Sequence, residues 1–206
     1  MALNPEDMDF ISNFSTLWAV FLGAVLATIG GFAATQLEWV IERRRRERNA
    51  ALFFGEVLST LSIVLGYAGS TKKIGDPFGP ITMRFLRSSL AEIEIYNRNR
   101  ESLYDLRSAE LRARIHTLIL RIGMPVDGVF DASNAIAAIE AQLKAPTLSD
   151  AERKDLETRL ASLNLTRENS FEFVMENGEQ LKSVIKALEP VAHFSFDHLE
   201  RVAQSA

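Results

Sequence analysis

The chain begins with one long apolar stretch. No charged side chain occurs in residues 10–37. At about 1.5 Å per helical residue, such a run can cross a hydrocarbon core of roughly 30 Å. The pattern predicts one transmembrane helix over residues 14–41, preceded by a short outer N-terminus of residues 1–13. The buried helix of a soluble protein is the alternative, and the arginine-rich segment that follows disfavours it.

The charges on the two sides of this stretch differ in sign. Residues 1–13 carry Glu6, Asp7 and Asp9 but no basic side chain, whereas residues 42–49 hold five arginines and two glutamates. Basic residues beside a span stay on the cytoplasmic side. We therefore expect a protein of the plasma membrane (bacterial inner-membrane type), with the N-terminus outside and the C-terminal domain in the cytoplasm. A cleavable signal peptide fits poorly, because its basic segment would precede the apolar stretch.

The basic juxtamembrane segment, residues 42–49, indicates contact with lipid headgroups. Each basic residue near an anionic leaflet contributes on the order of 1 kcal/mol. The segment lacks interleaved aromatic side chains, and the chain as a whole has a formal net charge of −4, so nucleic acid is not expected as a partner. The residues expected to set the topology and contact lipid are Arg43, Arg44, Arg45, Arg46 and Arg48.

Small residues recur at every fourth position of the predicted span. In a helix such a row forms a groove, which lets a second backbone approach closely. We expect this face to pack against another transmembrane helix, from a second copy or a partner subunit. A groove that faces lipid is the alternative. The row consists of Ser15, Ala19, Gly23, Ala27, Gly31 and Thr35.

A second apolar stretch, residues 50–69, holds Glu56 as its only charged residue. It could be a second span, although an ionisable group at that depth costs about 2.5–3.5 kcal/mol on insertion scales. No turn residues separate it from the arginines. We prefer a continuous helix that leaves the membrane and becomes the central, nearly all-round buried helix of a cytoplasmic domain spanning residues 50–206.

The remaining pattern predicts further helices and no strand. A loop rich in glycine and proline covers residues 69–80, and apolar spacing then indicates a helix over residues 81–96. After a polar interruption, a helix is expected over residues 102–122. The sequence Gly123-Met124-Pro125 should break or kink it, because proline removes a backbone donor.

The last part of the chain predicts a helical hairpin. One helix is expected before the turn at residues 145–148 and another after it, beginning with a capping box formed by Ser149 and Glu152. The second helix continues without proline to residue 190, with a possible bend near Gly178. The predicted fold is therefore all-α: one N-terminal transmembrane helix continues into a cytoplasmic helical bundle with a long antiparallel hairpin.

The side chains offer little chemistry. The chain has no cysteine, which excludes thiolate metal sites and cysteine nucleophiles. His116 is expected in the core or at its boundary. The cluster of His193, Asp197, His198 and Glu200 lacks the spacing of a known metal motif, and Ser195 within it should cap a helix start. No serine elbow or phosphate loop occurs. We expect no catalytic residue, metal or cofactor.

Acidic residues form two groups. Glu92 and Glu94 are one pair, and a second group on the last long helix has helical spacing. A solvated face explains that second group, and a docking surface for a basic partner is its functional alternative. Its members are Glu168, Glu172, Glu176 and Glu179.

The function expected from these features is non-enzymatic. The leading hypothesis is a membrane-anchored scaffold or accessory subunit of a complex, which presents its cytoplasmic hairpin to a partner and binds no evident small-molecule substrate. A single-pass signalling relay is the alternative, although residues 1–13 leave little room for an outer sensor. A two-span membrane protein and an enzyme with an unfamiliar helical site are further alternatives.

Overall fold

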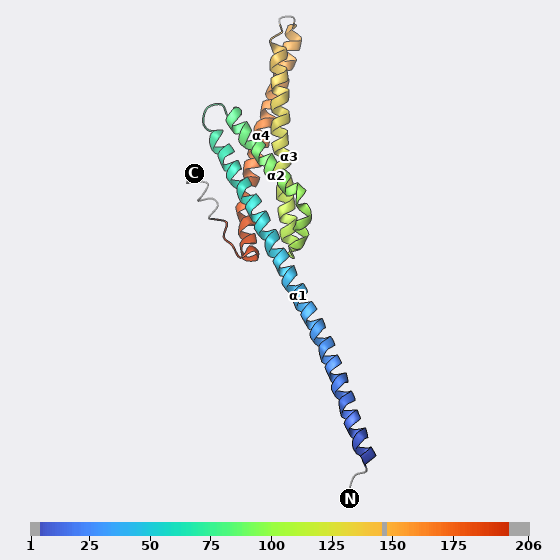
Figure 1. The fold of residues 1–206 in the computed structure, drawn as a ribbon. Helices are drawn as coiled ribbons and strands as arrows, with labels where there is room; N and C mark the ends of the chain where they lie inside the picture. Colours follow the sequence, from blue (N-terminus) through green and yellow to red (C-terminus); the bar gives the residue numbers. More distant parts are fainter. Residues whose placement is uncertain (1–4, 146–147, 198–206) are drawn as a thin grey trace. The chain divides into compact units, whose positions relative to one another are not determined.

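The computed structural model describes residues 5–145 and 148–197, and it describes side chains for residue 18 and from residue 20 onward within these ranges. Every regular element among the described residues is helical (Figure 1). The all-α prediction is therefore confirmed. In chain order the elements are α1 (Pro5–Thr71), α2 (Pro80–Arg98), the 3-10 helix η1 (Arg100–Asp105), α3 (Ala109–Leu143) and α4 (Asp150–Ala192).

The chain divides into two compact units, with the boundary between Arg45 and Arg46. This boundary falls inside α1, which is one uninterrupted helix from Pro5 to Thr71. The expected continuity of the N-terminal helix into the following domain is thus confirmed.

The first unit carries the apolar part of α1. From residue 20 onward this helix contains an 18-residue window of mean hydropathy 1.7, and none of that window is buried. By length and composition, α1 is able to cross a membrane. Its exposed large side chains include Val20, Phe21, Leu22, Leu26, Ile29, Phe32 and Leu37.

In the second unit four helices pack with alternating directions. The rings of Phe54 on α1 and Tyr96 on α2 lie 5.8 Å apart, and those of Tyr67 and Phe85 lie 5.4 Å apart. Later residues of α1 thus meet earlier residues of α2, as antiparallel packing requires. By the same reasoning, contacts described below make α3 antiparallel to α4 and α4 antiparallel to α1. The arrangement is an up-down-up-down bundle.

The core of this bundle includes the second apolar stretch of the sequence. Four large residues of α1 there are buried among α2, α3 and α4. The expectation of nearly all-round burial was too strong, because Glu56, Thr60 and Gly66 are exposed. The buried residues are Phe54, Leu58, Leu61 and Leu65.

The predicted hairpin is formed by α3 and α4, which run side by side (Figure 1). Arg114 Nη2 donates to Ser183 Oγ at 3.2 Å, and a Cβ at Gly128 would lie 3.3 Å from Ser170 Oγ, so the two helices are antiparallel. The capping box is confirmed: the Ser149 side chain accepts from the N–H of Glu152, whose carboxylate accepts from the N–H of Ser149.

Three local details differ from the expectations: α3 does not break at Pro125, and two helix boundaries are shifted. α3 continues through Pro125, because Ile122, Val126 and Val129 on either side remain buried in the core. Residues 100–105 form η1, and the regular helix begins only at Ala109, where the Ser108 side chain accepts from the N–H of Leu111 at 3.1 Å. α4 reaches Ala192 and passes through Pro190.

Candidate functional site

The predicted packing face of the span lies on α1. A Cβ added at Gly23 or Gly31 would meet nothing within 4 Å, and Thr35 Oγ1 donates to Gly31 O at 3.0 Å. The backbone of Ser15 and Ala19 also belongs to α1, although their side chains lie outside the described residues. Gly23, Ala27, Gly31 and Thr35 are exposed, so a second helix has access to the row.

The five arginines expected at the lipid headgroups have different surroundings. Arg44, Arg45 and Arg46 are exposed, and the guanidinium carbon of Arg43 lies 5.2 Å from the centre of the Trp39 ring. Arg48 Nε donates to Ala192 O, at the end of α4, at 3.1 Å. Arg48 therefore contributes to packing within the bundle, where it connects α1 to α4.

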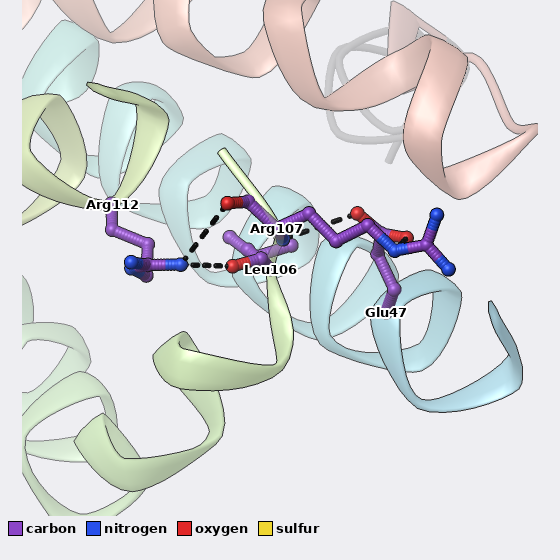
Figure 2. A network of polar contacts seen from close by, with 4 residues as sticks. All are labelled: Glu47, Leu106, Arg107 and Arg112. Atoms are coloured by element: carbon purple, nitrogen blue, oxygen red, sulfur yellow. Dashed lines mark hydrogen bonds and ion pairs between the residues drawn. The ribbon is translucent and has the colours of Figure 1, made fainter. Parts of the chain in front are cut away.

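Glu47, between these arginines, connects α1 to the segment that joins η1 and α3. One carboxylate oxygen accepts from the N–H of Arg107 at 3.1 Å, and the other lies 3.0 Å from Arg107 Nε. Figure 2 shows Arg112 on the other side of this segment, with Nη1 donating to the carbonyl oxygens of Leu106 and Arg107. Two side chains thus fix a short connection that has little regular structure of its own.

The segment that follows α4 also packs closely on α1. A Cβ at Gly55 would lie only 2.0 Å from Phe196 Cζ, and Phe196 is buried. The hydroxyl of Ser195 and the N–H of Phe196 both donate to Glu189 Oε1, at 3.0 and 2.9 Å. Glycine at position 55 therefore makes room for the aromatic ring that closes this end of the core.

A groove of about 660 Å³ lies between α1 and α4. Leu65 and Phe171 contribute apolar surface to the groove. Ser62 and Gly66, on the α1 side, are small and uncharged. A Cβ at Gly178 would lie 3.3 Å from Leu65 Cδ1, so the two helices are close beneath the groove. Its charged lining residues are Lys72, Lys73, Lys182, Glu172, Glu176 and Glu179.

The four glutamates predicted to share a face of α4 have two kinds of surroundings. Glu168 forms an ion pair with Lys72, whose ammonium nitrogen also lies 4.4 Å from the centre of the Phe171 ring. The other three glutamates, Glu172, Glu176 and Glu179, are exposed along the groove. Because three lysines line the same groove, its charge is mixed and no single ligand chemistry is favoured.

His116 lies at the boundary of the core. Its Nδ1 is 3.1 Å from the Tyr96 hydroxyl oxygen, and the two rings stack with centroids 6.5 Å apart. Burial raises the pKa of Tyr96, while the positive charge of Arg100 acts in the opposite direction. The prediction of a satisfied boundary histidine agrees with these contacts.

The other proposed ligand-type residues are only partly described. His193 ends α4 in a left-handed conformation with φ 50°, while His198 and Glu200 lie outside the described residues. Within residues 5–145 and 148–197, no group of three or more histidine or acidic side chains is arranged to hold a metal ion.

Glu92 and Glu94 have different surroundings on α2. Residues two apart on a helix point to different sides. The Glu94 carboxylate accepts from Arg98 Nε at 2.9 Å, whereas burial raises the pKa of Glu92.

Sequence reasoning missed the contacts that join distant segments. Glu47 and Arg107 are 60 positions apart, and no local pattern connects them. Small residues at 55, 59, 62, 66 and 69 do follow the spacing of one helix face, and that signal could have indicated where α4 approaches α1.

Comparison with known proteins adds no functional information. No protein-family model matches the sequence, and neither the curated proteins nor the solved structures provide a match.

Proposed function

We propose that this protein is a membrane-anchored helical scaffold or accessory subunit of a membrane protein complex. The N-terminal part of α1 holds the chain in a membrane of the bacterial inner-membrane type, with residues 1–13 outside and the bundle in the cytoplasm. The span associates with another helix, and the hairpin of α3 and α4 is presented to a partner.

One observation carries the anchor: large apolar side chains remain exposed along α1 from residue 20 to residue 41. They cover more of the helix surface than one packed neighbour would bury, whereas a bilayer surrounds a helix on all sides. The following apolar stretch differs, because Phe54, Leu58 and Leu61 are buried within the bundle. That burial favours a single span over the two-span alternative.

The small-residue face supports association in the membrane. Helices in lipid associate by close backbone packing, since the apolar surroundings supply no hydrophobic driving force. The open space beside Gly23 and Gly31 means that a larger side chain there would not disturb the isolated chain.

The test is to replace Gly23 or Gly31 with leucine. Leucine is more apolar than glycine, so insertion into the membrane should be preserved. The added side chain fills the groove, so we expect the complex to become smaller in mild detergent, while membrane fractionation and the helical circular dichroism spectrum stay unchanged.

The matched control is Val25→Leu, on a different face of the same helix, which should run at the wild-type size. If both glycine variants also run at that size, the row is not an interface and the scaffold proposal loses its support. Identification of the chains that co-purify with the wild type then separates self-association from binding to a partner subunit.

A signalling relay is a second candidate, because α1 is continuous from Pro5 to Thr71. A flexible four-residue insertion between Arg45 and Arg46 distinguishes the two functions. A scaffold should still form its complex with this insertion. A relay should no longer transmit a signal along α1 to the bundle.

A further inference from the structure

Arginines are concentrated at one end of the second unit, near residue 46, where the part of α1 that belongs to this unit begins. We define the basal surface as residues 46–48 and 98–112 together with Phe194. These residues include six arginines and four acidic side chains, whereas the remainder of residues 46–206 carries 14 basic and 18 acidic side chains. The basal surface is therefore net positive on a bundle that is otherwise net negative.

Contacts within the bundle bring these segments together. Glu47 binds both the N–H and the guanidinium group of Arg107, which places the η1–α3 connection against α1 (Figure 2). Arg48 donates to Ala192 O, two residues before Phe194. Three segments that are distant in sequence thus meet around residues 47 and 48.

The hydrogen bonds of Arg48 and Arg112 leave the positive charge of both side chains available. Arg48 and Arg112 donate to main-chain carbonyl oxygens, which have no formal charge to neutralise a guanidinium group. Arg107 and Arg98 are different, since Glu47 balances the charge of Arg107 and Glu94, which adjoins this surface, balances that of Arg98. The acidic residues Glu101, Asp105 and Glu110 are also exposed at this end and reduce the net charge without reversing it.

Two exposed aromatic side chains belong to the same surface. Tyr104 is 75% exposed, and the guanidinium carbon of Arg112 lies 5.9 Å from the centre of its ring. Phe194 is 41% exposed and packs edge-on against Phe196, with ring centroids 5.3 Å apart. Aromatic rings beside basic residues are typical of surfaces that reach the headgroup region of a bilayer.

We propose that the basal surface binds the headgroups of anionic phospholipids in the bilayer that holds the span; this inference rests on the proposed membrane anchor. Its charge is opposite to that of an anionic leaflet. Glu47 follows Ile41 by only six residues of the same helix. Only a short piece of chain therefore separates the two, and the attraction of a charged leaflet acts over roughly 8 Å at physiological salt.

The absence of cysteine from the chain makes a direct test possible. Full-length Tyr104→Cys and Ile74→Cys proteins are each labelled with a nitroxide-quenchable fluorophore and placed in nanodiscs of phosphatidylcholine with or without phosphatidylglycerol. Headgroup-nitroxide lipid serves as the quencher. Ile74 is a matched control because it is 78% exposed and lies on the loop just after α1, whose last residue, Thr71, is about 36 Å along the helix from Glu47.

With phosphatidylglycerol present, quenching at position 104 should exceed that at position 74 by about threefold or more, and high salt should reduce the difference. Arg100→Glu should lower quenching at position 104, whereas Arg153→Glu at the start of α4 should not. Equal quenching at positions 104 and 74 in anionic nanodiscs overturns the proposal. Co-elution of the chain with the nanodisc is measured separately. A chain that does not co-elute lacks the proposed membrane anchor, and the proposal then fails for that reason.

Discussion

Single residues in this protein act mainly where helices approach closely. Gly55 receives the buried ring of Phe196, and Gly178 lies beneath Leu65. Gly66, by contrast, has no neighbour within 4 Å of its missing Cβ. The glycines of α1 and α4 therefore differ in the space that their surroundings leave for a Cβ. Matched alanine substitutions can distinguish the crowded positions from the open one.

Gly55→Ala should destabilise the bundle by about 1–3 kcal/mol, because the new Cβ overlaps the Phe196 ring and forces core side chains to shift. Gly66→Ala should be neutral or stabilising by up to about 1 kcal/mol, since alanine favours an exposed helix position. Thermal unfolding of the full chain in mild detergent, followed by circular dichroism, provides both values.

A double substitution checks the proposed cause. Phe196→Ala alone should cost about 3–5 kcal/mol as a buried aromatic truncation. Gly55→Ala should then have a much smaller effect in the Phe196→Ala background than in the wild type. Additive effects of the two substitutions would show that the ring does not rest on Gly55.

At the level of elements, the start of α4 depends on a local hydrogen-bonded cap. Ser149 Oγ donates to Glu152 Oε2 at 2.6 Å, and hydrogen bonds from the Ser149 side chain and backbone lower the pKa of the Glu152 carboxyl. A carboxyl with a lowered pKa stabilises the fold above its unfolded pKa value. That stabilisation disappears as the pH falls through the folded value.

Loss of an N-cap usually costs about 1 kcal/mol, and we expect Ser149→Ala to destabilise the protein by this amount near neutral pH. The difference between wild type and variant should become smaller as Glu152 is protonated in acid. Unfolding measured from neutral pH to below pH 4 tests this trend. A difference that is constant over this range would argue against a contribution from the Glu152 carboxylate.

The elements show which features the sequence was able to predict. The cap of α4 was predictable because Ser149 and Glu152 are three positions apart and their interaction is local. The effect of Pro125 was overestimated, since Ile122 and Val126 keep both halves of α3 in the core. For Arg48 the sequence predicted only a contact with lipid. Its hydrogen bond within the bundle was not predictable, because the acceptor, Ala192 O, is 144 positions away.

At the level of the whole molecule, the charge contrast around the apolar stretch predicts its orientation. A fluorescent protein fused after residue 206 should be fluorescent, and alkaline phosphatase at the same position should be inactive, because the C-terminus is expected in the cytoplasm. An active phosphatase fusion would reverse the predicted topology.

A cysteine at position 74 separates one span from two. With a single span, Ile74→Cys should react with an impermeant maleimide only after the cells are lysed. Labelling in intact cells would place the loop after α1 outside and support the two-span alternative, in which residues 50–69 return through the membrane.

The half of the hairpin that adjoins the turn between α3 and α4 has buried residues of its own, apart from the main core, and this has consequences for evolution and engineering. Its buried residues Ala132, Ile136, Ile139 and Leu156 are separate from the main core cluster. Adding or deleting seven residues in each arm would preserve the facing surfaces of α3 and α4 and change the reach of the hairpin by about 10 Å. Homologous chains could thus differ in arm length by whole heptads while retaining the same four-helix core, so that the hairpin acts as an adjustable spacer.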